Sequence, residues 1–155
     1  FSHGIMTALF FAVVGIVYDR THSRDISVLG GLSKRMKITA SFFAVAGLAS
    51  LGLPGLSGFV AELLVFVGVF KTYLPLAVLA VIGAAITAVY ILRLLASTFF
   101  GPTSPQWSHL TDATRLEVGA TGILVVVLFF VGIWPAPLLR VIDSGVCNLV
   151  LVTCP

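Results

Sequence analysis

Charged side chains are scarce in this chain. Asp, Glu, Lys and Arg make up 10% of its 155 residues, whereas hydrophobic residues make up 59%, and the mean hydropathy is +1.14. Soluble domains carry about 25% charged residues, so this chain has too few polar groups to cover a globular surface. A soluble globular domain is therefore excluded, and lipid is the expected solvent and partner. The net charge of +3 comes from basic residues that flank apolar stretches, which is typical of membrane topology and not of nucleic-acid binding.

Ligand-forming and reactive residues are also scarce. Cys147 and Cys154 are the only cysteines, and their spacing predicts neither a metal site nor a redox pair. We find no phosphate-binding loop, no nucleophile–base pair and no ligand set for haem or a cluster. We therefore expect no metal and no cofactor on this chain. It begins with Phe1 inside an apolar run and has no signal peptide, so we interpret it as a piece of a longer membrane protein, cut within a span.

Four apolar segments predict an all-α, polytopic transmembrane helix bundle. They cover residues 1–18, 38–70, 74–100 and 118–134, in a single membrane domain 1–155 that ends in a tail, 135–155. A transmembrane helix needs roughly 20 apolar residues to cross about 30 Å. The first segment is interpreted as a truncated span, and the third and fourth as ordinary spans. The loop 19–37 carries five basic residues against two acidic ones, so the positive-inside rule predicts that it is cytoplasmic, or faces an equivalent negative side. Residues 101–117 then lie on the same side and the tail on the other.

The second segment is too long for one crossing. As a continuous helix its 33 residues would extend about 50 Å. The stretch "GLPGLSG" supplies a break, because Pro54 lacks a donor and Gly52, Gly55 and Gly58 permit non-helical dihedral angles. We expect two half-helices joined within the membrane near residues 52–58, an arrangement with which transporters build ion sites. An ordinary proline kink, or two separate spans, are the alternatives.

Glu62 is the only acidic residue between Asp25 and Asp112. It follows the break by four residues and is expected near the middle of the membrane, where a charge costs at least about 2.5–3.5 kcal/mol. Such a residue is a candidate proton carrier. The alternative is a structural glutamate paired with a cation from another span.

His3 is the second candidate, since histidine titrates near neutrality and can relay protons. Its expected depth differs from that of Glu62 by about 10 Å, so waters or polar groups such as Thr7 and Ser57 must connect them. On the third segment Thr87, Tyr90 and Arg93 recur every three residues and predict a buried polar face.

Three stretches resemble a known family. They are "SHGIMTALFFAVVGIVYDRTHSRD" (2–25), "LASLGLPGLSGFVAELLVFVGVF" (48–70) and "AVYILRLLASTFFGP" (88–102). They are similar to the antiporter-like subunits of respiratory complex I, the proton-pumping NADH:quinone oxidoreductase. The closest type is the one called M in bacteria and 4 in mitochondria, because sister subunits usually have a lysine where "GFVAELLVF" has its acid.

The resemblance implies that the segments are the last four spans of a larger bundle. It implies that Glu62 and His3 belong to a proton half-channel, driven by redox chemistry on partner subunits. Flavin, iron–sulfur clusters and quinone would be held by those subunits. The implied partners are other complex I membrane subunits, including sister antiporter-like ones, in a bacterial plasma membrane or an equivalent membrane. A multisubunit cation/proton antiporter or a membrane-bound hydrogenase shares these motifs and is the first alternative. A passive membrane scaffold is the second.

Overall fold

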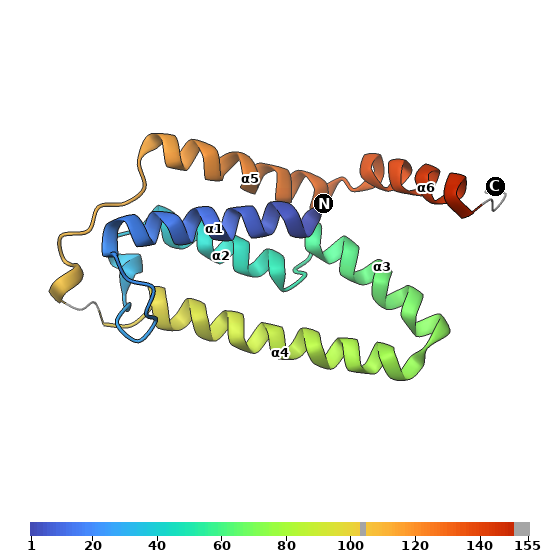
Figure 1. Cartoon of the computed structure of the whole chain (residues 1–155), viewed down its shortest axis with the longest axis horizontal. Coiled ribbons are helices and arrows are strands. Elements are labelled where there is room, and N and C mark those ends of the chain that lie inside the picture. Colours follow the sequence, from blue (N-terminus) through green and yellow to red (C-terminus); the bar gives the residue numbers. More distant parts are fainter. Residues whose placement is uncertain (103–104, 151–155) are drawn as a thin grey trace.

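The computed structural model describes residues 1–102 and 105–150, with side chains up to residue 147. Over this part all regular structure is helical, as the sequence predicts. Figure 1 shows the arrangement of six α-helices, of which α1, α2, α4 and α5 pack side by side. The helices are α1 (Ser2–Thr21), α2 (Lys37–Ser50), α3 (Ser57–Thr72), α4 (Leu74–Phe99), α5 (Arg115–Ile133) and α6 (Ala136–Val150), with short 3₁₀ turns at Leu32–Lys34 and Pro105–Trp107.

Three helices are long and apolar enough to cross a membrane on their own. They are α1 with 20 residues, α4 with 26 and α5 with 19. The second apolar segment, residues 38–70, contains two shorter helices, α2 with 14 residues and α3 with 16. Each of these would be only about 21–24 Å long, less than the roughly 30 Å of hydrocarbon. The turn between α3 and α4 lies at the opposite end of the molecule from the loops that follow α1 and α4 (Figure 1). Together, α2 and α3 therefore run from one end to the other.

The link between α2 and α3 is non-helical from residue 51 to residue 56. Gly52 and Gly55 have φ angles of 60° and 94°, in the region that favours glycine. Leu56 is extended and is the N-cap residue of α3, which begins at Ser57, so Gly58 lies inside that helix and not in the link. A side chain at Gly58 would overlap the Ala49 carbonyl group, so its absence lets α3 start directly against the end of α2.

Helix α5 approaches this link through Gly132. A side chain there would overlap the backbone of Gly55 and Leu56, whereas a side chain at Gly122, on the same helix, would have nothing within 4 Å. On this side, the link is therefore covered by the backbone of α5 and not by lipid. Non-helical backbone at membrane depth is tolerated where protein covers it.

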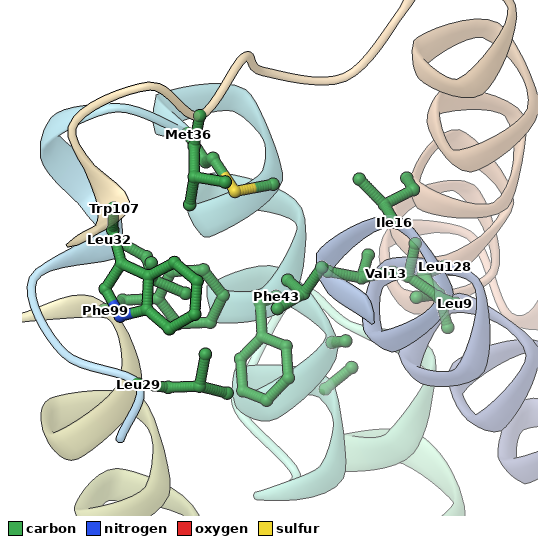
Figure 2. Packing of buried hydrophobic residues seen from close by; sticks show 14 of the residues in the cluster. Leu9, Val13, Ile16, Leu29, Leu32, Met36, Phe43, Phe99, Trp107 and Leu128 are labelled. Carbon is green, nitrogen blue, oxygen red and sulfur yellow. The ribbon is translucent and has the colours of Figure 1, made fainter. Parts of the chain in front are cut away.

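The apolar core extends from the end of the molecule that carries the basic loop as far as Leu56 in the link. Phe43 of α2 packs between Phe10 of α1 and Phe99 of α4, with ring centroids 5.2 and 4.9 Å away. Figure 2 shows Trp107 beside Phe99 and Leu32, and its indole N–H donates to the Val28 carbonyl at 3.0 Å. The core therefore joins three helices to both loops of this end.

A polar cluster joins the same loops to the helices. Arg20 of α1 donates to both carboxylate oxygens of Glu117 at the start of α5, at 3.2 and 2.6 Å. Asp112, from the loop before α5, accepts from the backbone N–H of Ile38 at 2.8 Å and of Thr39 at 3.2 Å. These are the second and third residues of α2, the positions that an N-cap side chain normally satisfies. Met36, the residue that precedes α2, makes no side-chain cap, so Asp112 caps α2 from 74 residues away.

Hydrogen bonding determines the ionisation of Asp112, which lies in a loop outside the helices. Burial raises the pKa of its carboxyl. The hydrogen bonds from the backbone of Ile38, Ala113 and Thr39 and from the Thr39 hydroxyl lower it by more, so the pKa lies below the ordinary value. The carboxylate is therefore the form that holds α2.

The tail contains a helix that we did not predict. α6 follows Pro135 and is amphipathic, with Leu138, Leu139 and Ile142 on one face and Arg140 on another. Cys147 in this helix is disulfide-bonded, a bond that our prediction of no metal site and no redox pair did not include. Cys154 lies outside the described residues.

Candidate functional site

Glu62 lies in the second turn of α3, directly beside the link. A side chain at Gly52 would overlap the Glu62 carboxylate, so the positive φ angle and the missing side chain of Gly52 together provide the space that the carboxylate occupies. Glu62 is half-buried. Within the described residues its carboxylate has no hydrogen bond and no ion pair, so the structural alternative of a glutamate paired with a cation has no support in this part of the chain.

Glu62 and His3 line the same cavity. This cavity, which we call the inner cavity, has a volume of about 240 Å³ and lies between the start of α1, the end of α2 and the start of α3. Ser2 and Ser50 also line it. A water molecule occupies roughly 30 Å³ in the liquid, so the inner cavity is large enough for several. Water could therefore connect the imidazole with the carboxylate without direct contact.

Glu62 also lines a smaller cavity. It has a volume of about 50 Å³, is lined by Ser50 and Thr87 and reaches α4. Glu62 thus contributes to the wall of both cavities, as does Ser50. A carboxylate in this position can accept a proton from one cavity and donate it to the other, which is the chemistry of a carrier.

The hydroxyl groups near His3 form two contacts. The Thr7 hydroxyl lies 3.4 Å from His3 Nδ1, one turn along α1. The hydroxyl groups of Ser2 and Ser57 lie 2.7 Å apart and join the start of α1 to the start of α3. Ser57 is buried.

The predicted polar face of α4 is only partly brought to the site. Thr87 lines the small cavity, although its hydroxyl donates to its own helix at the Gly83 carbonyl. Tyr90 and Arg93 are exposed on the surface of the described chain. Among the residues that the structure describes, no cluster of His, Cys, Asp and Glu could hold a metal ion.

Sequence reasoning missed Ser2 and Ser50. Ser2 is next to His3, and Ser50 is the last residue of the half-helix α2. Serine is common at helix ends without any function. The only available signal was their adjacency to His3 and to the break.

The family is decided by a sequence comparison. Residues 1–87, more than half of the chain, match the family described as "NADH:quinone oxidoreductase/Mrp antiporter, TM". The chain belongs to this family. Its match includes α1, the link and Glu62, so the site lies within the matched region.

Individual relatives agree with this assignment. NADH-quinone oxidoreductase subunit M of Rickettsia prowazekii is 34% identical over 151 residues, which are 97% of this chain and 31% of the relative. The chain therefore spans about a third of the length of such relatives. Among solved structures, respiratory complex I from Thermus thermophilus matches with a TM-score of 0.75 and 32% identity, over 79% of this chain and 26% of the other. An archaeal membrane-bound sulfane sulfur reductase matches with a TM-score of 0.81 and 30% identity, over 86% of this chain and 22% of the other.

Proposed function

We propose that this chain is part of a proton-translocating, antiporter-like membrane subunit of a complex I-type NADH (or ferredoxin):quinone oxidoreductase. The observation that carries the proposal is the position of Glu62, beside a helix break and on the wall of two cavities, with His3 on the wall of the larger one. Membership of the family and the naming of its relatives support the enzyme class. Flavin, iron–sulfur clusters and quinone belong, in this proposal, to partner subunits.

In the proposed mechanism, Glu62 takes up and releases the transported proton and His3 relays it. Within the described residues no cation neutralises the Glu62 carboxylate, so taking up the proton removes an uncompensated charge from this half-buried position. Redox chemistry elsewhere in the complex would bias this protonation step. The passive scaffold is disfavoured, because a structural glutamate at this position would need a cation partner.

We also propose the topology. α2 and α3 form one discontinuous crossing, which with α1, α4 and α5 makes four. The end that carries the loops 22–36 and 100–114 faces the cytoplasm, because its basic residues follow the positive-inside rule. The tail with α6 then lies on the opposite side. The disulfide at Cys147 supports this orientation, since disulfides persist in oxidising compartments.

The family description covers both oxidoreductases and Mrp antiporters, so it does not separate our proposal from the antiporter alternative. Copurification separates the two alternatives. We expect flavin and iron–sulfur subunits in the purified complex, and their absence would favour an antiporter.

The test of the carrier role is Glu62→Gln, which keeps the shape of the side chain and removes the titrating proton. We expect the complex to assemble and protons pumped per electron to fall, measured in proteoliposomes. Asp25→Asn, in the exposed loop 22–36, is the control and should pump normally. His3→Ala should slow pumping less than Glu62→Gln, because water can replace a relay. Normal pumping by assembled Glu62→Gln complexes would refute the carrier role.

A further inference from the structure

A third cavity lies beyond the serine pair. It has a volume of about 340 Å³ and lies between the start of α1, the first half of α3, the end of α5 and α6. Figure 1 shows these four elements meeting at one place, away from the basic loops. We call this cavity the vestibule. Its polar side chains are Ser2, Ser57 and Asp143, and the rest of its wall is apolar.

The vestibule is adjacent to the inner cavity. Ser2 and Ala61 line both cavities, and the hydrogen bond of 2.7 Å between Ser2 and Ser57 lies where the two approach each other. A hydroxyl group can accept one proton and donate another, so a serine pair can pass a proton without acquiring a net charge. The residues thus follow the order Glu62, Ser2 with Ser57, and Asp143.

Asp143 occupies an unusual position on α6. Its neighbours on the wall of the vestibule are apolar, namely Leu138, Leu139 and Ile142 of the same helix. Asp143 is itself exposed, so its carboxylate can reach both the vestibule and the solution outside it. In the part of the chain with described side chains, Asp143 has no hydrogen bond and no ion pair. A packing role for the carboxylate is therefore absent from this structure.

We propose that Asp143 is the outermost proton-carrying group of this chain and that the vestibule is its gate. This inference rests on the proposed function. In the outward direction, the Glu62 carboxyl gives its proton to water in the inner cavity. The serine hydroxyls accept one proton and donate another, and water in the wetted vestibule delivers it to the Asp143 carboxylate. Glu62 is left as a carboxylate, the serines are unchanged, and Asp143 releases the proton to the outer solution.

The apolar wall explains how leakage is prevented. A carrier acid that is connected by water to both sides at once would let protons flow back. Water enters a mostly apolar cavity less readily than a polar one, so the apolar wall, with Leu64, Val131 and Leu138, keeps the route closed between transfers.

The first test is Asp143→Asn in the whole assembled complex. We expect the rate of proton pumping to fall by about tenfold or more, since a positioned proton-transfer group contributes about 10²–10⁴-fold. Electron transfer measured with an uncoupler should not change, and Asp143→Glu should restore pumping. The control Ser144→Ala, next to Asp143 but outside the vestibule, should pump normally. Normal pumping by Asp143→Asn would overturn the assignment.

The second test addresses the gate without turnover. Val131→Asn makes the wall of the vestibule polar, and we expect a faster passive proton leak in proteoliposomes. Ile133→Asn is the matched control, because Ile133 lies at the same end of α5, is 73% exposed and does not line the vestibule. Equal leak rates for the two variants would overturn the gate. If Glu62→Gln pumps normally, the proposed function itself fails. If Glu62→Gln loses pumping while Asp143→Asn pumps normally and Val131→Asn leaks no more than its control, only this inference is rejected.

Discussion

At the scale of single residues, the site depends on a side chain that is missing. Gly52 places no atom where the Glu62 carboxylate lies, and its φ of 60° is a conformation that other residues adopt at a cost. Glu62 and Gly52 are ten residues apart, so the sequence presents them as two separate signals, a lone acid and a turn residue. The structure makes them one feature, a carboxylate held against the backbone of the link.

Gly52→Ala should therefore displace Glu62. We expect the variant to pump fewer protons per electron although Glu62 itself is unchanged, because the methyl group would occupy the position of the carboxylate. Gly68→Ala is the control, since nothing lies within 4 Å of a side chain there. Proton pumping in proteoliposomes and the amount of assembled complex are the measurements. Normal pumping by Gly52→Ala would mean that the carboxylate can function in another position.

Asp112→Asn should weaken the start of α2. The amide retains an acceptor but loses the charge, and the loss of a good N-cap interaction costs about 0.5–2 kcal/mol. Thermal unfolding of the purified complex measures this, with the exposed Asp19→Asn as control. An unchanged unfolding temperature for Asp112→Asn would contradict the capping role.

The pH dependence of this contact has a definite sign. The folded pKa of Asp112 lies below the ordinary value, so its stabilisation is present above the ordinary aspartate pKa of about 3.9. The stabilisation is lost as the pH falls from there through the folded pKa. We expect the difference between wild type and Asp112→Asn to be constant from neutral pH down to about pH 5 and to shrink in more acidic buffer.

At the scale of the elements, the sequence predicts helices well and their ends less well. Apolar runs of the right length identify α1, α4 and α5 within a few residues, because lipid imposes a minimum length on a crossing helix. The conflict between 33 residues and one crossing predicts the region of the link, and "GLPGLSG" locates it. α6 was missed because its apolar residues recur with helical spacing but form no continuous run, and we read the tail by hydropathy alone.

The site was predictable only in part. A lone acid in an apolar segment points to Glu62 by its desolvation cost. Nothing in the sequence reveals that Ser2 faces Ser57, because a contact between residues 55 apart depends on how α1 and α3 pack. The vestibule could not be predicted from the sequence for the same reason, because residues of four helices line it.

Gly132 provides a test of packing between elements. Gly132→Ala should destabilise the complex by about 1–3 kcal/mol, because a methyl group would overlap the backbone of Gly55 and Leu56. Gly122→Ala, on the same helix, should be neutral or slightly stabilising, since nothing lies within 4 Å and alanine favours helix. The unfolding temperatures of the two variants are the measurement. Equal values would show that close packing of α5 against the link does not contribute to stability.

At the scale of the whole molecule, both long loops lie at one end. The backbone N–H of Gly31 donates to the Phe100 carbonyl at 3.3 Å, Trp107 bonds Val28, and Arg20 binds Glu117. The first two contacts join the loops 22–36 and 100–114 to each other, and the third joins the helices α1 and α5 beside them. A single orientation in the membrane must therefore place both on the same side.

Thiol labelling tests this orientation. A cysteine introduced by Ser27→Cys should react with a membrane-impermeant reagent only from the cytoplasmic side. One introduced by Tyr73→Cys, in the turn between α3 and α4, should react only from the other side. Reaction of both from the same side would contradict the single discontinuous crossing of α2 and α3.

The distant cap of α2 has a consequence for the order of synthesis. Residues 37–50 leave the ribosome long before Asp112, which satisfies the first backbone N–H groups of that helix. While the following 74 residues are translated, Asp112 cannot accept the hydrogen bonds of the first N–H groups of α2. The start of α2 is therefore capped only after the loop before α5 has been made. A nascent chain arrested after residue 102 should therefore show a frayed start of α2 by hydrogen exchange, and one arrested well past Asp112 should show it protected. Insertion of α5 and completion of the start of α2 would then occur together.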